Sequence, residues 1–217
     1  MNIEYWSKSY QQSKVKFKES IDLIKSKNIA VKYESLDIGE LDTEGNSLAI
    51  DIAWIGNKNA KKLYLSTSGI HGVEGFAGSA IQLFVIDNLE KIPDDTAIAF
   101  VHIMNPWGMA WLRRENESNV DLNRNFLPLN EEYTGCHEHY PILNPLINIS
   151  KVAKRNDFFN IKLALHTLYH GKTKTKQAYA EGQYTYPKGL HFGGFKLEKG
   201  PSKFIDWLQK NLKNVKD

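Results

Sequence analysis

The sequence predicts an α/β fold in which a mixed, mainly parallel sheet is flanked by helices. An apolar run at residues 62–67, a helix-length apolar segment at 75–89 and a second apolar run at 97–104 follow one another. This order is typical of a strand, a crossover helix and a parallel strand. Two alternating, β-branched segments precede it and predict further strands. A length of 217 residues with 41% hydrophobic residues is enough for one core, so we expect a single domain over residues 1–217.

The N-terminal part predicts a helix followed by a hairpin. Residues 5–27 carry apolar side chains at roughly helical spacing with lysines between them, as in an amphipathic helix lying on a sheet. Residues 29–38 and 47–55 alternate in strand period and are separated by a glycine-containing loop. In the second of these strands we expect Asp51 to face water and Trp54 to face the core.

The strand-helix-strand segment brings two strand ends to one edge of the sheet. A right-handed crossover makes strands 62–67 and 97–104 parallel, so their carboxyl ends open on the same side. We expect His102, inside the second strand, to be a buried or edge histidine and not a ligand. A final helix is predicted over residues 201–213, with a hydrophobic face and a proline near its start.

Charge and composition exclude several classes of protein. The 28 basic and 25 acidic residues are interspersed and leave a net charge of +3, which argues against nucleic acid as a partner. No run of 18 apolar residues occurs, so no membrane span is expected. The single Cys136 excludes an internal disulfide and a cysteine-rich zinc cluster. Because no signal-peptide pattern is found at the start, we expect a cytoplasmic protein.

The glycine-rich turn after residue 67 carries two side chains that could share a ligand. His71 and Glu74 are three residues apart, so in a helical turn they point the same way. An imidazole and a carboxylate can each give one bond to zinc. Alternatively, Glu74 simply lies near a helix N-terminus, where a negative charge is favourable. This motif alone does not decide between the two interpretations.

A polar segment at residues 111–126 concentrates arginines around a few apolar anchors. Arg113, Arg114 and Arg124 lie among acid and amide side chains. Since the guanidinium fork binds carboxylates in a bidentate manner, the segment favours an anionic ligand.

Several phrases of the sequence together resemble a known family. They are His71-Gly72-Val73-Glu74, Asn105-Pro106-Trp107-Gly108, Arg114-Glu115-Asn116 and Val120-Asp121-Leu122-Asn123-Arg124-Asn125-Phe126. Their order and spacing resemble the motifs of the zinc carboxypeptidase family, and the resemblance covers most of the chain. It is closest to an uncharacterised bacterial branch, which shares longer phrases with residues 72–79, 111–114 and 182–190.

The resemblance implies the phosphorylase/hydrolase-like fold of zinc carboxypeptidases and a metallopeptidase activity. His71 and Glu74 match the first two ligands of a single zinc ion. Arg114 matches the residue that polarises the scissile carbonyl, and Asn123 and Arg124 match the pair that holds the substrate carboxylate. The implied substrate is a peptide or N-acyl amino acid with a free carboxylate, hydrolysed by metal-activated water.

The sequence departs from the family pattern at the third zinc ligand and at the general-base glutamate, neither of which has a clear match. His166 could end an apolar strand as the third ligand, or it could lie in a helix, as in the related branch. There the ligand strand follows the final helix, whereas this chain stops at Asp217, so we expect a C-terminally shortened domain. Weaker substitutes are His137, His139 and His191.

Two classes of function remain open at this stage. The first is carboxypeptidase-type hydrolysis of a C-terminal peptide or amide bond, weak or lost if the missing groups are absent. The second is a non-catalytic relative that binds a carboxylate or peptide, or a homo-oligomer that completes an open sheet edge. Deacylation of an N-acyl amino acid is a third option that the sequence does not separate from peptide hydrolysis.

Overall fold

The computed structural model describes residues 3–149, 151–152, 154 and 157–215 and divides into two compact units. Unit 1 comprises Met1–Glu117 and Glu198–Asp217, and unit 2 comprises Ser118–Leu197. Asp217, at which the sequence analysis expects a shortened domain to stop, lies outside the described residues.

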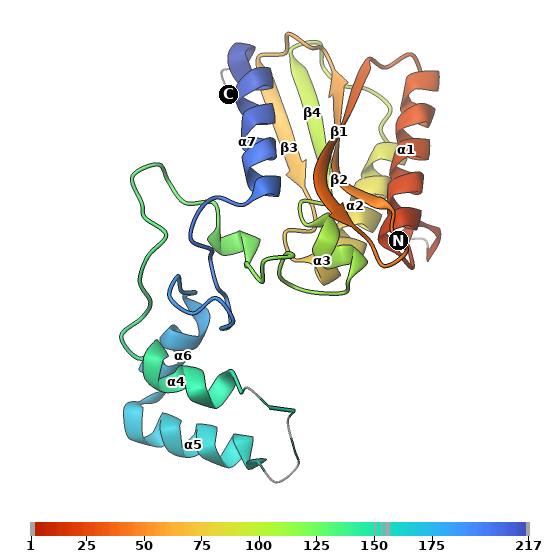
Figure 1. The fold of residues 1–217 in the computed structure, drawn as a ribbon. Helices are drawn as coiled ribbons and strands as arrows, with labels where there is room; N and C mark the ends of the chain where they lie inside the picture. Colours follow the sequence, from red (N-terminus) through yellow and green to blue (C-terminus); the bar gives the residue numbers. More distant parts are fainter. Residues whose placement is uncertain (1–2, 150, 153, 155–156, 216–217) are drawn as a thin grey trace. The chain divides into compact units, whose positions relative to one another are not determined.

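Unit 1 contains the sheet, and unit 2 is built from helices and loops (Figure 1). The elements of unit 1 are η1 (Ile3–Tyr5), α1 (Tyr10–Ser26), β1 (Val31–Leu41), β2 (Ser47–Gly56), β3 (Lys62–Thr67), η2 (Gly72–Glu74), α2 (Gly75–Asp87), β4 (Thr96–His102), α3 (Pro106–Ala110), α7 (Lys199–Asn211) and η5 (Leu212–Asn214). Those of unit 2 are η3 (Leu122–Arg124), α4 (Tyr140–Ile147), α5 (Phe159–His170) and α6 (Lys172–Ala180). Among the described helices, none combines the length and apolar character that crossing a bilayer requires.

The sheet is mixed and has the strand order β1-β2-β4-β3. The β3 and β4 strands pair in parallel, as the crossover predicts, while β1 with β2 and β2 with β4 are antiparallel. The predicted α/β fold with a mixed sheet flanked by helices is confirmed. Fewer of the strand pairs are parallel than expected, because β2 of the β1–β2 hairpin pairs antiparallel with β4. Strand patterns in the sequence do not reveal such a long-range pairing.

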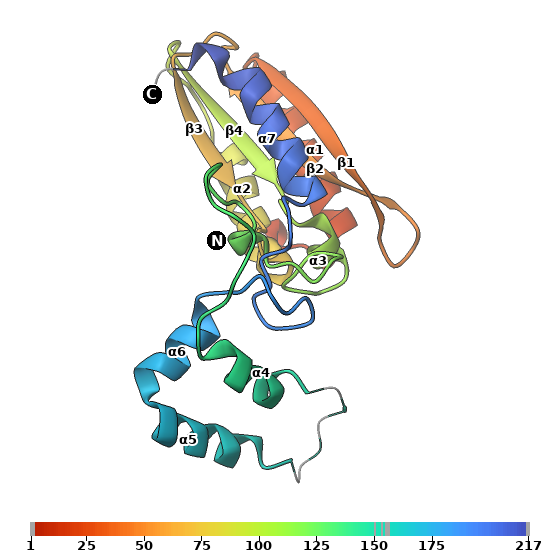
Figure 2. The same ribbon diagram turned by 60° about the vertical axis from the view of Figure 1, so that its left-hand side comes forward.

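Helices cover both faces of the sheet (Figures 1 and 2). On one face, α1 and α2 enclose a core with β2 and β4, formed by Phe17, Ile21, Ile24, Ala53, Ile55, Leu83, Ile86 and Phe100. On the other face, the ring of Trp207 in α7 lies 6.2 Å from that of Trp54 in β2. The Trp207 indole also donates a 2.8 Å hydrogen bond to Glu34 in β1. The amphipathic pattern of the predicted final helix is thereby explained, because α7 packs on β1 and β2.

Asp51 is fully buried, so the prediction that it faces water is wrong. Its strand, β2, lies between β1 and β4, and its side of the sheet is covered by α1. The carboxylate accepts a 2.7 Å hydrogen bond from the Tyr33 hydroxyl and lies 3.6 Å from the Lys14 ammonium. Trp54 is buried as expected. Asp51 and Trp54 point to opposite faces of the strand, as predicted, but Asp51 faces a buried polar network and not solvent.

His102 forms a second buried polar contact on the same face, next to Asp51 in the β2–β4 register. The hydroxyls of Ser13 in α1 and Ser79 in α2 each lie 2.9 Å from its Nε2 atom. Phe17 stacks on the ring with centroids 4.4 Å apart. The prediction of a buried histidine is confirmed, and the ring joins both helices to the sheet.

Burial lowers the pKa of His102 from 6.5 to about 3, and the nearby Lys14 charge acts in the same direction. Between these two pH values the unfolded chain binds a proton that the folded protein does not. We therefore expect the free energy of unfolding to fall as the pH drops from 6.5 toward 3, with His102 contributing at most about 1.4 kcal/mol per pH unit.

The slope can be measured by urea denaturation across this pH range, with His102→Gln as the comparison, because that variant should lose about one proton of pH dependence. NMR titration of the wild-type ring gives an independent readout. A His102 that titrates between about pH 5 and 8 in the folded protein would contradict this account.

Candidate functional site

The segments that follow β3 and β4 lie side by side at one edge of the sheet. The amide of Ser68 donates to the carbonyl of Val101 at 3.1 Å, and Met104 donates back to Ser68 at 2.8 Å. The Asn105 amide then donates to the carbonyl of Gly69 at 2.9 Å. The expectation that both strand ends open on the same edge is confirmed.

Two glycines allow a close backbone approach at this edge. A Cβ atom at Gly72 would lie 1.9 Å from the carbonyl carbon of Gly108, so no other residue fits without displacing the chain. Gly69 has a φ of +66°, and a Cβ there would lie 2.9 Å from a methyl group of Ile103. The glycine-rich phrase therefore lets the turn after β3 pack directly against α3.

Asn105 and the main chain of Arg114 hold this contact in place. The Asn105 side chain accepts a 2.8 Å bond from the Gly108 amide and caps α3. Its amide group donates to the carbonyl of Arg114 at 3.2 Å, and the Gly72 amide donates to the same carbonyl at 3.2 Å. The loop that carries Arg114 is thus tied to both strand-end segments.

The result is a cluster of His71, Glu74 and Arg114. His71 precedes η2, which ends at Glu74, and His71 Nδ1 lies 3.2 Å from Glu74 Oε1. Arg114 Nη1 lies 3.6 Å from the same oxygen. The His71 side chain is only 12% exposed, whereas Glu74 is 68% and Arg114 36% exposed. A ligand can therefore reach the carboxylate and the guanidinium from solvent, beside a ring that is largely fixed.

His71 and Glu74 have the right donor types for zinc, but they provide only two donors. Zinc sites in proteins use at least three protein ligands. Within the described ranges, no three histidine, cysteine, aspartate or glutamate side chains are arranged to hold a metal ion. The fit to zinc is incomplete in this part of the chain.

The other two expected site residues, Asn123 and Arg124, belong to η3 in unit 2. The Arg124 guanidinium donates to the carbonyls of Glu181 and Ala180 at 2.9 Å each and to that of Asn123 at 3.1 Å. Three of its five N–H groups are thereby directed at the main chain, mainly at the end of α6. The side chain of Asn123 is exposed.

The η3 turn is supported from below by two buried side chains, Asp121 and Asn125. Asp121 accepts the Asn123 amide at 3.0 Å and lies 3.2 Å from His191 Nδ1. Asn125 donates to the carbonyls of Gly193 and Lys196. Both side chains therefore support the η3 loop. The Asp121–His191 pair was not anticipated, because its members are 70 residues apart in sequence.

His166 lies in α5, so its helical interpretation is confirmed and the strand-end interpretation is wrong. Residues 161–167 are apolar enough for either structure, and the helix continues to His170. In the loop before α4, His137 Nδ1 accepts a 3.1 Å hydrogen bond from the main-chain amide of His139.

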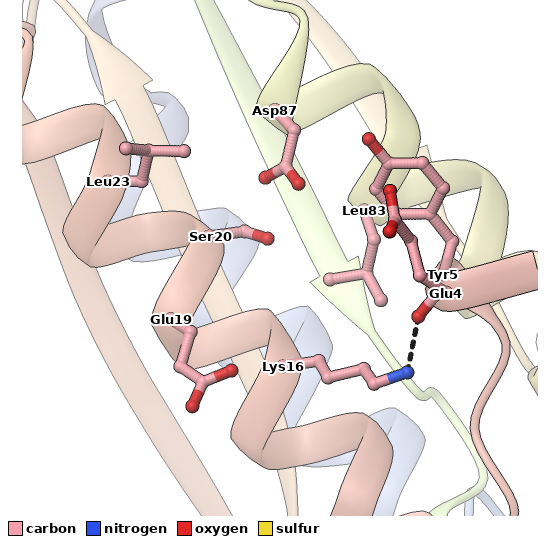
Figure 3. A pocket seen from close by; sticks show the side chains of 8 residues that line it. All are labelled: Glu4, Tyr5, Lys16, Glu19, Ser20, Leu23, Leu83 and Asp87. Atoms are coloured by element: carbon pink, nitrogen blue, oxygen red, sulfur yellow. Dashed lines mark hydrogen bonds between the residues drawn. The ribbon is translucent and has the colours of Figure 1, made fainter. Parts of the chain in front are cut away.

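A separate pocket of about 280 Å³ lies among η1, α1 and α2 in unit 1 (Figure 3). Its lining residues are Glu4, Tyr5, Lys16, Glu19, Ser20, Leu23, Leu83 and Asp87. The Lys16 ammonium at its edge donates to the carbonyl of Glu4. None of the expected site residues lines this pocket, so it is distinct from the turn at His71.

The fold has counterparts among solved structures. Bovine thrombin-activatable fibrinolysis inhibitor, solved in complex with a tick carboxypeptidase inhibitor, aligns with a TM-score of 0.50 and 15% identity over 97% of this chain. The chain spans 58% of the length of that structure. Carboxypeptidase A from Helicoverpa armigera aligns at 0.38 with 21% identity, over 55% of this chain and 33% of its own. A putative metallopeptidase from Shewanella amazonensis SB2B aligns at 0.39 with 19% identity, over 55% and 41%.

The sheet and its flanking helices thus define an α/β protein with a metallocarboxypeptidase-like fold. A family profile described as protein of unknown function (DUF2817) matches residues 6–216. The chain belongs to the DUF2817 family. No curated protein sequence matches it.

The contact between Gly72 and Gly108 predicts a large asymmetry between two glycine substitutions. Gly72→Ala should lower the free energy of unfolding by about 3 kcal/mol or more, because its methyl group collides with backbone atoms. Gly200→Ala in α7 is the control, since its Cβ would meet no atom closer than 3.5 Å. The control should be neutral or stabilising by up to about 1 kcal/mol. Equal urea midpoints for the two variants would contradict the packing described here.

Proposed function

We propose that this protein is a zinc-binding, metallocarboxypeptidase-like hydrolase relative whose ligand site is centred on His71, Glu74 and Arg114. The observation that carries the proposal is the approach of both His71 and Arg114 to the Glu74 carboxylate, at 3.2 and 3.6 Å. The fold similarity and the sequence phrases that surround this cluster support it. The cytoplasmic location, the bacterial origin and a single domain over residues 1–217 belong to the same proposal.

In this proposal His71 and Glu74 hold one zinc ion, which would supply a Lewis acid for amide hydrolysis. The role of Arg114 would follow from its charge, because a guanidinium stabilises negative charge that develops on a carbonyl oxygen. The third protein ligand and the general-base glutamate are not identified, so we assign no catalytic step to the isolated chain. Its turnover should be low or absent.

The proposed substrate class is a peptide or N-acyl amino acid with a free carboxylate. Asn123 and Arg124 are assigned to that carboxylate. The support is chemical: Arg124 has two N–H groups left after its three bonds to the main chain. Fixed by those bonds, it would present its remaining donors with little loss of side-chain freedom.

The first test is zinc affinity measured by isothermal titration calorimetry. His71→Ala and Glu74→Gln should each weaken binding at the turn by at least about tenfold, because each removes one of two donors. Glu44→Gln, an exposed carboxylate in the β1–β2 loop, is the matched control and should leave the affinity unchanged.

The companion measurement is turnover of a panel of N-acyl dipeptides with added zinc. We expect rates close to those of the Glu74→Gln variant, in keeping with the missing groups. Zinc binding with the same number of equivalents and the same affinities in the wild type, His71→Ala and Glu74→Gln would overturn the metal assignment whatever the rates.

A second candidate function, association through the sheet edge, is favoured by the exposure of β3. Among the described strands, β3 pairs only with β4, and Tyr64 on it is 63% exposed. Ile81 on the neighbouring α2 is 51% exposed, although a helix that is apolar on all sides is normally buried. Such an edge invites pairing with another strand.

The sequence of β3 favours a second copy of the chain as the partner. If two β3 strands pair antiparallel about a two-fold axis between Tyr64 and Leu65, Lys62 lies opposite Thr67, so no like charges face each other. The same pairing would bring the two exposed faces of α2 toward one another.

This association predicts a dimer at micromolar concentration by light scattering. Tyr64→Lys should shift the mass toward the monomer, because it places a charge at the pairing edge. Val15→Lys on the exposed face of α1 is the control and should not change the mass. A monomeric wild type over this concentration range would remove the second candidate.

A further inference from the structure

Unit 2 gathers histidines in one place. Four of the seven histidines in the chain, His137, His139, His166 and His170, fall between the loop before α4 and the end of α5. None of the four takes part in the His71–Glu74 contact or in the Asp121–His191 pair. The ring of His170 contacts those of His139 and His166, and the ring of His137 contacts that of His139.

The spacings of the ring centroids are close to those of imidazoles that share one metal ion. His166 and His170 are four residues apart on α5 and lie on one face, with ring centroids 4.5 Å apart. His139, next to the start of α4, brings its ring within 4.8 Å of His170. Two imidazoles bound to one tetrahedral zinc ion have ring centres roughly 5 Å apart. A helical pair at this spacing, completed by a third histidine from another element, is a recurrent zinc arrangement.

The ring nitrogens support a ligand at this position. The Nε2 atoms of His139 and His166 are buried and have no hydrogen-bond partner among the described residues. Leaving such atoms unsatisfied is unfavourable, and a metal ion would satisfy both.

One ion pair involves the residue beside His139. Glu138 lies 3.7 Å from the Lys174 ammonium of α6, so these two opposite charges offset each other. As they stand, the His139 ring meets the His170 ring edge to face and the His166 ring is tilted against it, so the three rings are not arranged around one ion. Because α5 fixes the backbone spacing of two of them, rotation of the side chains is the change that binding requires.

We propose that His139, His166 and His170 form a binding site for a first-row divalent metal ion, zinc or nickel, separate from the turn at His71. The site has three neutral nitrogen donors and leaves a fourth position for water. Since α4 and α5 both contribute ligands, the ion would join the two helices.

The proposal is tested in the His71→Ala/Glu74→Gln background, where binding at the first turn is removed. Titration with zinc and with nickel should still find one equivalent per chain, and cobalt should give the visible spectrum of a tetrahedral nitrogen site. His166→Phe and His170→Phe keep an aromatic ring for packing but remove the donor. Each should weaken binding at least about tenfold.

Two further measurements separate a metal site from aromatic packing. His191→Gln removes another histidine of unit 2 and should leave the affinity unchanged. Zinc should raise the melting temperature of the background protein but not that of its His170→Phe form. Affinity that is unaffected by both phenylalanine variants, or the absence of binding at micromolar zinc, would overturn this proposal. Neither result bears on the site at His71.

Discussion

The close approach of Gly72 to Gly108 is the constraint on which the expected site depends. A Cβ atom at Gly72 would collide with the main chain of Gly108, so only glycine allows the end of β3 to pack against the short helix that follows β4. Asn105 and the carbonyl of Arg114 then tie the third segment to the first two. His71 and Arg114, which are more than 40 positions apart in sequence, both reach the Glu74 carboxylate because these contacts hold the three segments together.

The chemistry available at this edge depends on which side chains are buried and which are exposed to solvent. His71 is held by the fold, while the carboxylate beside it is open to solvent and is shared with a guanidinium. In the proposed function this arrangement binds a cation beside a polarised carbonyl. Among the described residues no third donor joins His71 and Glu74, so the proposal expects binding more strongly than turnover.

Much of the fold and part of the site follow from local sequence. The boundaries of β3 and the start of α2 match the predicted ones, because period and glycine position are local signals. Asp51 was misplaced because its exposure depends on α1, which is distant in sequence. The contacts of His139 with α5 were missed for the same reason. The hydrogen bond from Arg124 to the main chain at the end of α6 could not be predicted, because the position of that helix end is not a local signal around Arg124.

The most direct measurement of the central claim is anomalous diffraction at the zinc edge from crystals grown with zinc. The account predicts a peak within bonding distance of both the His71 ring and the Glu74 carboxylate, with Arg114 alongside. Diffraction that places zinc elsewhere, with no peak at this turn, would contradict it.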